Sequence, residues 1–585
     1  MGGVWCCLIR ADRLETIVLR LHLGLVTCAV LTMIMGSVSL LLVTPMLLLV
    51  SLRAAIIRYR WIRRHPESAS APAPPEAYTW LERSCCAALA IIAGLTLISV
   101  LAPITSWDAG AAHLAVASDY ARAGKIQLLT GNVYSMYPQL LQSVFAYLFQ
   151  MSGEGGVALF CWGYGVLACA TMWVLGQGLA DRRAGILSAV FLATAPFYIS
   201  QASTVAIDLP FAATVLAAVV CWVHWRDSKT RIWLILMGVL LGSACGMRHT
   251  GYIVSVLCVM GVLCEGRSLR GCLLLGGVTL CAALPWLLRS YALVGNPFFP
   301  LLDSLFPQEI YAYHQETRLG QHETIREMSI TGFISYPWSM VMHPERYDGW
   351  SANPGPWVWI LGIPGLLLGG RNLRALGLFS LLGMSGFYFL QRLVRYAVPF
   401  YMPMMVVAGV TGSRLSRHSK ALTALIVASL IYGCLLAAGS VYFKVPVALG
   451  LESREDYLDR RLDGYATFAW LNAHIPEGAC VLTLDLRSYY IDRPTFEFVE
   501  QLHELKPLDF DGKVSWLAER KIRYVVLSET AMQYPFIAHT GIGDELNSWR
   551  EAPDHFRLIS TDAPIDPVYE VLWPEVLEDA PPEQP

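Results

Sequence analysis

The stretch that decides the fold is IVLRLHLGLVTCAVLTMIMGSVSLLLVTPMLLLVSLRAAII, residues 17–57. About 20 apolar residues are enough to cross the ~30 Å hydrocarbon layer of a membrane, and this run is roughly twice that length. Gly36 and Ser37 lie near its middle, where a turn fits. Arginines surround both ends: Arg10, Arg13, Arg20, Arg53, Arg58, Arg60, Arg63 and Arg64. Because arginine and lysine mark cytoplasmic ends, we expect a tight transmembrane hairpin with both ends inside.

The composition of the whole chain agrees with this expectation. Of 585 residues, 55% are hydrophobic and only 15% are charged, whereas soluble domains carry about 25% charged residues. The formal net charge of −2 gives no sign of a nucleic-acid partner. The 15 cysteines are scattered, several within apolar runs, and such free thiols behave as small buried hydrophobes. The chain is therefore predicted to be a polytopic membrane protein.

Apolar spans and basic loops then alternate along the chain. The hairpin provides two spans, and eleven more follow at Cys85–Pro103, Val157–Gly178, Ile186–Ile199, Leu209–Val223, Ile232–Gly246, Tyr252–Cys264, Leu273–Leu288, Trp357–Leu368, Ala375–Leu390, Val398–Val410 and Leu422–Tyr442. Every loop assigned to the inside carries at least two basic residues, and the outer turns carry few. This predicts thirteen crossings, with the N-terminus cytoplasmic and the C-terminal part outside.

Changes in composition divide the chain into five parts. Residues 1–64 are the hairpin, 65–83 a Pro- and Ala-rich cytoplasmic linker, 84–443 the main transmembrane domain, 444–574 an outer domain, and 575–585 an acidic, Pro-rich tail that we expect to be disordered. In the outer domain, residues 464–474 have helical spacing and residues 479–484 resemble a buried strand. A second helix at 514–521 leads to a second strand at 524–527, so a small α/β domain is expected.

Two acids fall at the outer surface of this topology. Asp108 follows the first outward span in the sequence Ser-Trp-Asp-Ala-Gly-Ala-Ala-His-Leu (106–114), and Asp208 opens an inward span just before Pro210. Acids at a membrane boundary are functional candidates because burying their charge is costly. An alternative is that each is a helix N-cap, accepting hydrogen bonds from free backbone N–H groups. Residues 108–120 are also expected to form an amphipathic helix on the membrane surface.

Cationic side chains gather on the same side. Arg248 and His249 share an outer turn, Arg289 ends an outward span, and Arg392 and Arg395 lie at another outer turn. Arginine suits phosphate because its planar guanidinium donates paired hydrogen bonds. The alternative is that each arginine only extends to the interface, but four of them in outer turns otherwise nearly free of basic residues favour an anionic lipid ligand.

Several motifs resemble those of GT-C glycosyltransferases related to family 39, which include protein O-mannosyltransferases and lipid A aminoarabinose transferases. The resemblance covers residues 85–494. Its motifs are Ser106-Trp107-Asp108 with His113, Asp181–Gly185 followed by Phe191–Pro196, Asp208, Pro285–Tyr291 with Gly295-Asn296-Pro297, Arg395-Tyr396-Ala397-Val398-Pro399, Trp470-Leu471-Asn472 and Ile475–Gly478. No single motif is specific, but their order and membrane side together are. The resemblance implies an all-α GT-C-like membrane domain with a small C-terminal α/β domain.

The resemblance also implies a chemistry. A sugar would pass, with inversion, from a polyprenyl-phosphate donor to a glycan, lipid or protein acceptor outside the cytoplasm. Asp108 would be the general base, and Asp208 would orient Asp108, His113 or the acceptor. Donor phosphate would be held by cationic and polar residues: Arg289, Arg395, Arg248, His249, His113 and Tyr396. No cofactor is expected, and the first outer loop lacks the second acid that relatives use, which argues against a metal there.

Two other functions fit part of the pattern. A transporter or flippase for lipid-linked sugars would be polytopic too, but it would place charges near the midplane between inverted repeats, and the chain has no clear internal repeat. A polymerase or ligase of the O-antigen type remains open within the enzyme class. In every case the protein would lie in the plasma (inner) membrane.

Overall fold

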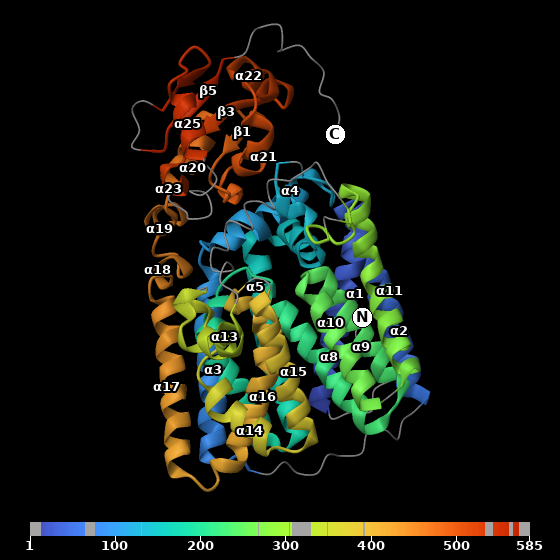
Figure 1. The fold of residues 1–585 in the computed structure, drawn as a ribbon. Helices are drawn as coiled ribbons and strands as arrows, with labels where there is room; N and C mark the ends of the chain where they lie inside the picture. Colours follow the sequence, from blue (N-terminus) through green and yellow to red (C-terminus); the bar gives the residue numbers. More distant parts are fainter. Residues whose placement is uncertain are drawn as a thin grey trace.

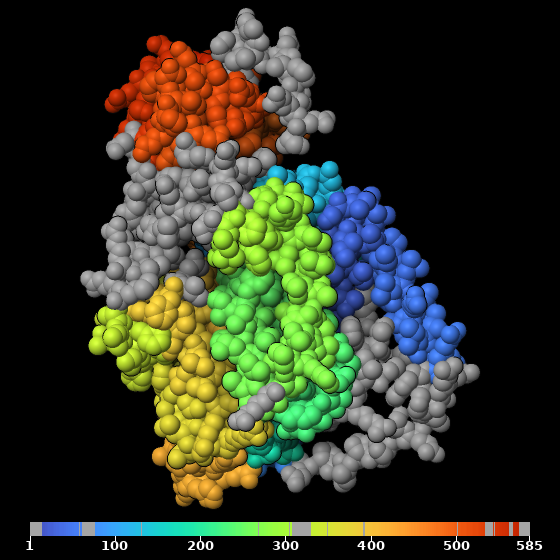
Figure 2. Space-filling model, turned by 45° about the vertical axis from the view of Figure 1, so that its right-hand side comes forward, coloured from blue at the N-terminus to red at the C-terminus, as the bar shows by residue number. Residues whose placement is uncertain are grey.

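The computed structural model describes residues 13–64, 77–129, 131–266, 268–302, 305–306, 329–347, 349–389, 392–532, 542–560 and 565–572. The tail at 575–585 and most of the linker, residues 65–76, lie outside the described residues. The described chain forms a large helical part and a smaller domain built on a β-sheet, which stands beyond one end of the helices (Figures 1 and 2).

The helical part contains most of the chain. Its long helices are α1 (Arg13–Gly36), α2 (Val43–Arg64), α3 (Trp80–Leu101), α5 (Leu140–Leu179), α6 (Arg182–Ala193), α8 (Asp208–Ser228), α9 (Arg231–Met247), α10 (Thr250–Gly266), α11 (Leu269–Val294), α15 (Arg371–Gly386), α16 (Val398–Leu415) and α17 (Lys420–Tyr442). Shorter pieces are α7 (Pro196–Gln201), α13 (Ile330–Met342), α14 (Ile363–Leu368) and the π-helix η9 (Val358–Gly362).

Among the described helices, eight are long and apolar enough to cross a membrane. They are α1, α2 from Leu40, α3, α5, α8, α11, α16 from Val394, and α17. The expected polytopic helical architecture is confirmed at this level, and every predicted span overlaps a helix. The N-terminal hairpin α1–α2 flanks the bundle (Figure 2), where α1 packs against α5 and α9.

Two spans differ from the prediction. The span expected at 186–199 is broken between α6 and α7, because Pro196 has no N–H to donate and holds Ala195 in an extended conformation. The span expected at 157–178 is part of the longer helix α5, which bends at Gly153, where φ is 64°. Thirteen residues of the expected outer loop, 140–152, are therefore helical.

The rest of that outer loop carries the π-helix η4 (Ala109–His113), α4 (Leu114–Ala123) and the 3-10 turn η5 (Val133–Met136). The helix expected over 108–120 is thus present, but its first turn is a π-turn. In Figure 1, α4 lies at the end of the bundle nearest the sheet domain. Within the described part of this loop, η4 and α4 pack against residues 488–490 of the C-terminal domain.

The C-terminal domain has a five-stranded mixed sheet in the order β2-β1-β3-β5-β4. Its strands are β1 (Cys480–Thr483), β2 (Thr495–Glu497), β3 (Ile522–Val526), β4 (Phe556–Leu558) and β5 (Val568–Val571). Strand β1 is parallel to β2 and β3, and β5 is antiparallel to β3 and β4. The expected α/β domain is confirmed.

Helices cover both faces of this sheet. One face packs against α21 (Phe498–Leu505), α22 (Phe510–Glu519) and α25 (Ile542–Arg550). The other packs against α19 (Arg454–Arg461) and α20 (Tyr465–His474), with α18 (Val445–Ala448) joining α17 to them and α23 (Glu529–Met532) following β3. The predicted helix at 464–474 is α20. The helix expected at 514–521 begins earlier, at Phe510, because Asp509 caps it.

Candidate active site

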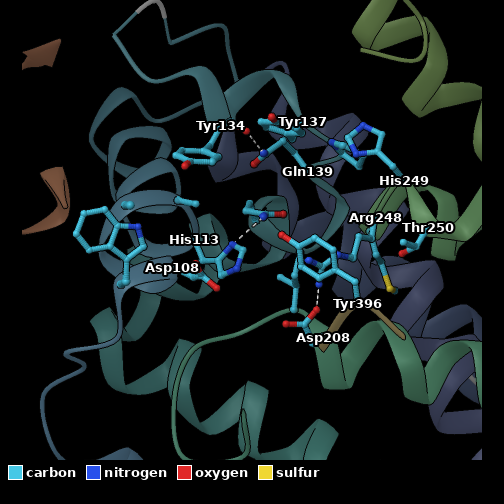
Figure 3. A pocket seen from close by; sticks show the side chains of 17 residues that line it. Asp108, His113, Tyr134, Tyr137, Gln139, Asp208, Arg248, His249, Thr250 and Tyr396 are labelled. Carbon is cyan, nitrogen blue, oxygen red and sulfur yellow. Dashed lines mark hydrogen bonds and ion pairs between the residues drawn. The ribbon is translucent and has the colours of Figure 1, made fainter. Parts of the chain in front are cut away.

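A cavity of about 170 Å³ lies at the end of the bundle beneath α4 (Figure 3). It is lined by Trp107, Asp108, Ala111, Ala112, His113, Tyr134, Tyr137, Pro138, Gln139, Gln142, Ile207, Asp208, Met247, Arg248, His249, Thr250 and Tyr396. Six of the eight residues proposed from the sequence are therefore in one place. They come from four separate parts of the chain, which only the folded bundle brings together.

Asp108 enters the cavity from the start of η4. It occupies the N-cap position of that helix, but its side chain makes no capping hydrogen bond. Its carboxylate is instead ion-paired with the guanidinium of Arg395, which comes from the turn η11 (Val394–Ala397) before α16. Burial alone would raise the pKa of Asp108, but Arg395, with Arg248 behind it, holds that pKa below its usual range. Asp108 is thus ionised at neutral pH.

Asp208 is the first residue of α8 and is almost fully buried. The N-cap of α8 is Ile207, so Asp208 does not occupy the capping position; its carboxylate is ion-paired with Arg248, in the turn between α9 and α10 (Figure 3). The N-cap alternative considered for both acids is therefore wrong. Each acid is held by an arginine from a distant part of the sequence.

Tyr396 joins the two ion pairs. The Arg248 guanidinium lies 3.8 Å from the centre of the Tyr396 ring, and that of Arg395 lies 5.5 Å from it. A cation over an aromatic face is attracted by the ring's electron density. The tyrosine therefore holds the two guanidinium groups on one side of the cavity.

The two histidines make different contacts. Gln142 Nε2 lies 3.1 Å from His113 Nδ1, so the amide donates to the ring. Burial lowers the pKa of His113 to about 4, although the charge of Asp108 acts in the opposite direction. His113 is thus neutral at pH 7. His249 Nε2 lies 2.7 Å from the carbonyl oxygen of Phe299 and donates to it.

Arg395 does not itself line the cavity but reaches it through its ion pair with Asp108, and Arg289 is not among the described lining residues either. The guanidinium of Arg289 donates to the backbone oxygen of Ser135 at 3.2 Å and to the hydroxyl of Tyr120 at 2.9 Å. It thereby ties α11 to η5, the turn that carries Tyr134 into the cavity. Its position is that of a support for the cavity wall.

Neutral polar residues complete the lining, and the sequence did not single them out. The Oε1 atoms of Gln139 and Gln142 are buried and accept no hydrogen bond from the described residues. Such acceptors are costly to bury empty and suit the hydroxyl groups of a sugar. Two aromatic residues close to Pro138, Tyr134 and Tyr137, were the one available signal, because aromatic rings in a polar outer loop suit sugar binding.

Metal ligands are a separate question. Within the described ranges, no group of three or more histidine, cysteine, aspartate or glutamate side chains is close enough together to hold a metal ion. The two cavity acids already face guanidinium groups, which are poor neighbours for a cation.

The C-terminal domain holds the segment that carries Asp108. Tyr490 donates from its hydroxyl to the carbonyl oxygen of Ile104 at 2.6 Å, and the N–H of Ile104 donates to Glu154 at 2.5 Å. The guanidinium of Arg487 lies 5.2 Å from the ring of Trp107. The base candidate is therefore fixed partly by contacts from a domain that does not line the cavity.

Residues 135–288 match the model of a family described as dolichyl-phosphate-mannose-protein mannosyltransferase. The match begins in η5, at the cavity wall, and includes Asp208 and Arg248. It confirms the resemblance to GT-C glycosyltransferases and, with it, the enzyme class. No curated protein matches the chain in sequence.

Solved structures show the same fold. The crystal structure of ArnT from Cupriavidus metallidurans in the apo state superposes with a TM-score of 0.55 at 14% identity, covering 83% of this chain and 97% of that one. The structure of ArnT from the same organism bound to undecaprenyl phosphate gives a TM-score of 0.52 over the same shares, again at 14% identity. At 14% identity, these superpositions show a shared fold and no more.

Proposed function

We propose that the chain is an inverting glycosyltransferase that moves a sugar from a polyprenyl phosphate to an acceptor outside the cytoplasm. The observation that carries the proposal is the pair of acids, Asp108 and Asp208, each ion-paired with an arginine in one cavity. The family match supports the reaction class, and ArnT, whose fold is similar, has been crystallised with undecaprenyl phosphate. The acceptor is a glycan, a lipid or a protein.

The topology follows from the same proposal. The chain crosses the plasma (inner) membrane thirteen times, with its N-terminus cytoplasmic, and the cavity and the sheet domain lie outside. Residues 84–443 are the catalytic domain, 444–574 the outer domain, and 1–64 an added hairpin. A lipid-linked donor is then required, because nucleotide sugars are cytoplasmic.

The reaction needs one displacement. An acceptor hydroxyl attacks the anomeric carbon, the bond from that carbon to the phosphate oxygen breaks, and the hydroxyl proton passes to Asp108. The low pKa of Asp108 is compatible with this role, because the attacking oxygen becomes strongly acidic as its bond to carbon forms. Asp208 holds Arg248 in place, and Tyr396 stacks on that arginine.

The leaving group gains negative charge as it departs. Arg395 and Arg248 stand at the cavity to stabilise that charge, and a guanidinium has five N–H donors, enough for a carboxylate and a phosphate at once. Gln139 and Gln142 offer acceptors for the hydroxyl groups of the sugar. His113 and His249 border the donor, and Arg289 supports the wall behind it.

The test is Asp108→Asn in the purified full chain, with a polyprenyl-phosphate sugar as donor. Sugar transfer, and the slower release of sugar to water without acceptor, should both fall at least about a hundredfold, since ~10²–10⁴ is typical of a lost general base. Asp119→Asn is the matched control, because Asp119 lies on α4, pairs with Arg122 and does not line the cavity. Full activity of Asp108→Asn would refute the assignment.

The transporter alternative gives a different result. Purified protein in liposomes would then carry a lipid-linked sugar from one leaflet to the other with its phosphate bond intact. The glycosyltransferase cleaves that bond instead, which thin-layer chromatography of the lipid product shows directly.

A further inference from the structure

A second cavity lies across the Ile104–Asp108 segment from the first. Its volume is about 570 Å³, and it is lined by Ile104, Thr105, Ser106, Pro196, Ile199, Ser200, Ser203, Thr204, Trp350, Ser351, Tyr432, Leu436, Ser440 and Lys444. Thr105 and Ser106 face this cavity, whereas the next two residues, Trp107 and Asp108, face the first one. The short segment Ile104–Asp108 therefore separates the two cavities and carries the base candidate, Asp108, between them.

The lining of the second cavity combines apolar side chains with a set of hydroxyl groups and one cation, Lys444. It contains seven serine and threonine hydroxyls, and none of the described residues in it is acidic. Ser203 is 4% exposed, and its hydroxyl has no hydrogen-bond partner among the described residues. Buried hydroxyls without partners are costly, so this surface is built to be completed by a polar ligand.

Lys444 is the cation of this cavity. Its ammonium donates to Ser99 Oγ at 2.7 Å and to the backbone oxygen of Ser203 at 3.2 Å, which uses two of its three hydrogens. Both partners are neutral. Burial, with Arg461 nearby, lowers the pKa of Lys444 to about 8. A partly buried ammonium with two neutral partners and one further hydrogen to donate favours an anionic ligand, which supplies the missing charge.

The second cavity continues into an apolar groove of about 350 Å³. The two share Pro196, Trp350 and Tyr432. Along α17 the groove is lined by Leu425, Ala428, Ser429 and Tyr432, and the cavity by Tyr432, Leu436 and Ser440. These residues recur every three or four positions, so they form one stripe of the helix. Lys444 follows just beyond the end of the helix.

This stripe gives the shape of the ligand. From Leu425 to Ser440 it is about 22 Å long at 1.5 Å per residue, most of the thickness of the hydrocarbon layer, and Lys444 lies just beyond its end. The polar end lies near the sheet domain, where α17 ends, and the apolar end runs back along a membrane-spanning helix (Figure 1). A molecule with an anionic head and a long apolar chain matches both ends.

Resting on the proposed function, we infer that this groove binds the acceptor, and that the acceptor is a lipid with an anionic head group. A displacement needs the nucleophile and the leaving group on opposite sides of the anomeric carbon. The first cavity, with its arginines, takes the donor sugar and phosphate. The second cavity then presents the acceptor hydroxyl past Thr105 and Ser106 to Asp108, while Lys444 holds the phosphate or carboxylate of the head group.

The test uses the full chain in detergent and native mass spectrometry, with dioleoyl phosphatidic acid as the anionic lipid and dioleoylglycerol as its neutral match. Lys444→Met should weaken phosphatidic acid binding about tenfold, the value of one charge-assisted hydrogen bond. Lys444→Arg should restore binding. Lys420→Met is the control, because Lys420 is exposed at the opposite end of α17. Dioleoylglycerol binding should be the same in all four proteins.

The apolar part has its own variant. Ala428→Trp fills the groove and should weaken both lipids, whereas Ala438→Trp, on an exposed position of the same helix, should not. Undecaprenyl phosphate is the remaining probe, and its binding should be unchanged in Lys444→Met. If Lys444→Met weakens undecaprenyl phosphate instead, the groove belongs to the donor and the inference is overturned. If phosphatidic acid binding does not respond to Lys444→Met, it is also overturned.

These outcomes are separate from those that test the proposed function. Release of sugar to water requires the donor and Asp108 but no acceptor. It should therefore persist at the wild-type rate in Lys444→Met and vanish in Asp108→Asn. If lipid binding overturns the acceptor inference but sugar release still behaves in this way, the proposed glycosyltransferase function is retained.

Discussion

Glu154 offers a strong test of how the C-terminal domain sets the position of the base. It follows the bend of α5 at Gly153, and its side chain is 11% exposed. One carboxylate oxygen accepts from the N–H of Ile104 at 2.5 Å, and the other accepts from Tyr489 at 2.8 Å and from Arg454 at 2.6 Å. Glu154 therefore joins the outer domain to the segment that ends at Asp108.

The change Glu154→Gln keeps the shape and removes the charge. Hydrogen bonds to charged groups are worth about 1.5–3 kcal/mol and neutral ones about 0.5–1.5 kcal/mol, so the Ile104 bond should lose about 1 kcal/mol. The pair with Arg454 adds less than about 1 kcal/mol, because that arginine is 44% exposed and screened by solvent. If about 1.4 kcal/mol of this serves to hold Asp108 in the transition state, turnover falls about tenfold.

The assay is steady-state sugar transfer, together with a thermal unfolding curve. We expect kcat to fall about tenfold while the donor KM stays constant, since the donor contacts lie in the cavity. Glu452→Gln is the matched control: Glu452 is also paired with an arginine, Arg460, but touches neither Ile104 nor the cavity.

A double mutant adds a second criterion. Tyr490→Phe removes the bond to the carbonyl of Ile104, so the two variants act on the same residue from its two ends. If both serve one position, their effects on kcat should not multiply. A lowered unfolding temperature with unchanged kcat would refute the reasoning, because Glu154 would then stabilise the fold without positioning the base.

Three further results are expected. Gly110→Ala should lower kcat, because its Cβ would stand 3.0 Å from the ring of Tyr490, whereas Gly163→Ala, with open space around it, should be neutral. The profile of kcat against pH should be flat between about pH 5.5 and 7.5 and fall below about pH 4. The reason is that the pKa of Asp108 is held below its usual range and that of His113 is lowered to about 4. An inflection near pH 6.5, the usual pKa of histidine, would contradict this. Asp108→Asn, though inactive, should bind undecaprenyl phosphate more tightly than the wild type, as a titration by native mass spectrometry would show.

The residue types of the site and their place at the ends of apolar helices were predictable from local sequence, and the side of the membrane stays a prediction. Asp108, Asp208, Arg248 and Arg395 all follow or precede apolar runs, and the basic inner loops indicate on which side those ends fall. The pairing of each acid with its arginine was not predictable, because the partners are 287 and 40 residues apart. The distance between two residues along the chain does not indicate which helix ends meet in the folded bundle.

Neutral residues were missed for a different reason. Gln139 and Gln142 carry no charge and fall within the first turns of a helix, so they resemble ordinary polar positions. Their role becomes visible only once burial and the absence of partners for Oε1 within the described residues are known. Strands β2, β4 and β5 were missed because three or four residues are too few to show alternation.

The charge balance of the cavity explains why both acids are paired with arginine. Two carboxylates, two guanidinium groups and a neutral His113 leave the resting site close to neutral, so it binds the singly charged donor phosphate without trapping it. In the proposed reaction, Arg395 loses its counter-ion when the acceptor proton reaches Asp108, at the moment the leaving phosphate gains a negative charge. Arg395 is then available to that phosphate, and the stabilisation is greatest in the transition state, as catalysis requires. Return of the proton to water restores the Asp108–Arg395 pair and releases the polyprenyl phosphate.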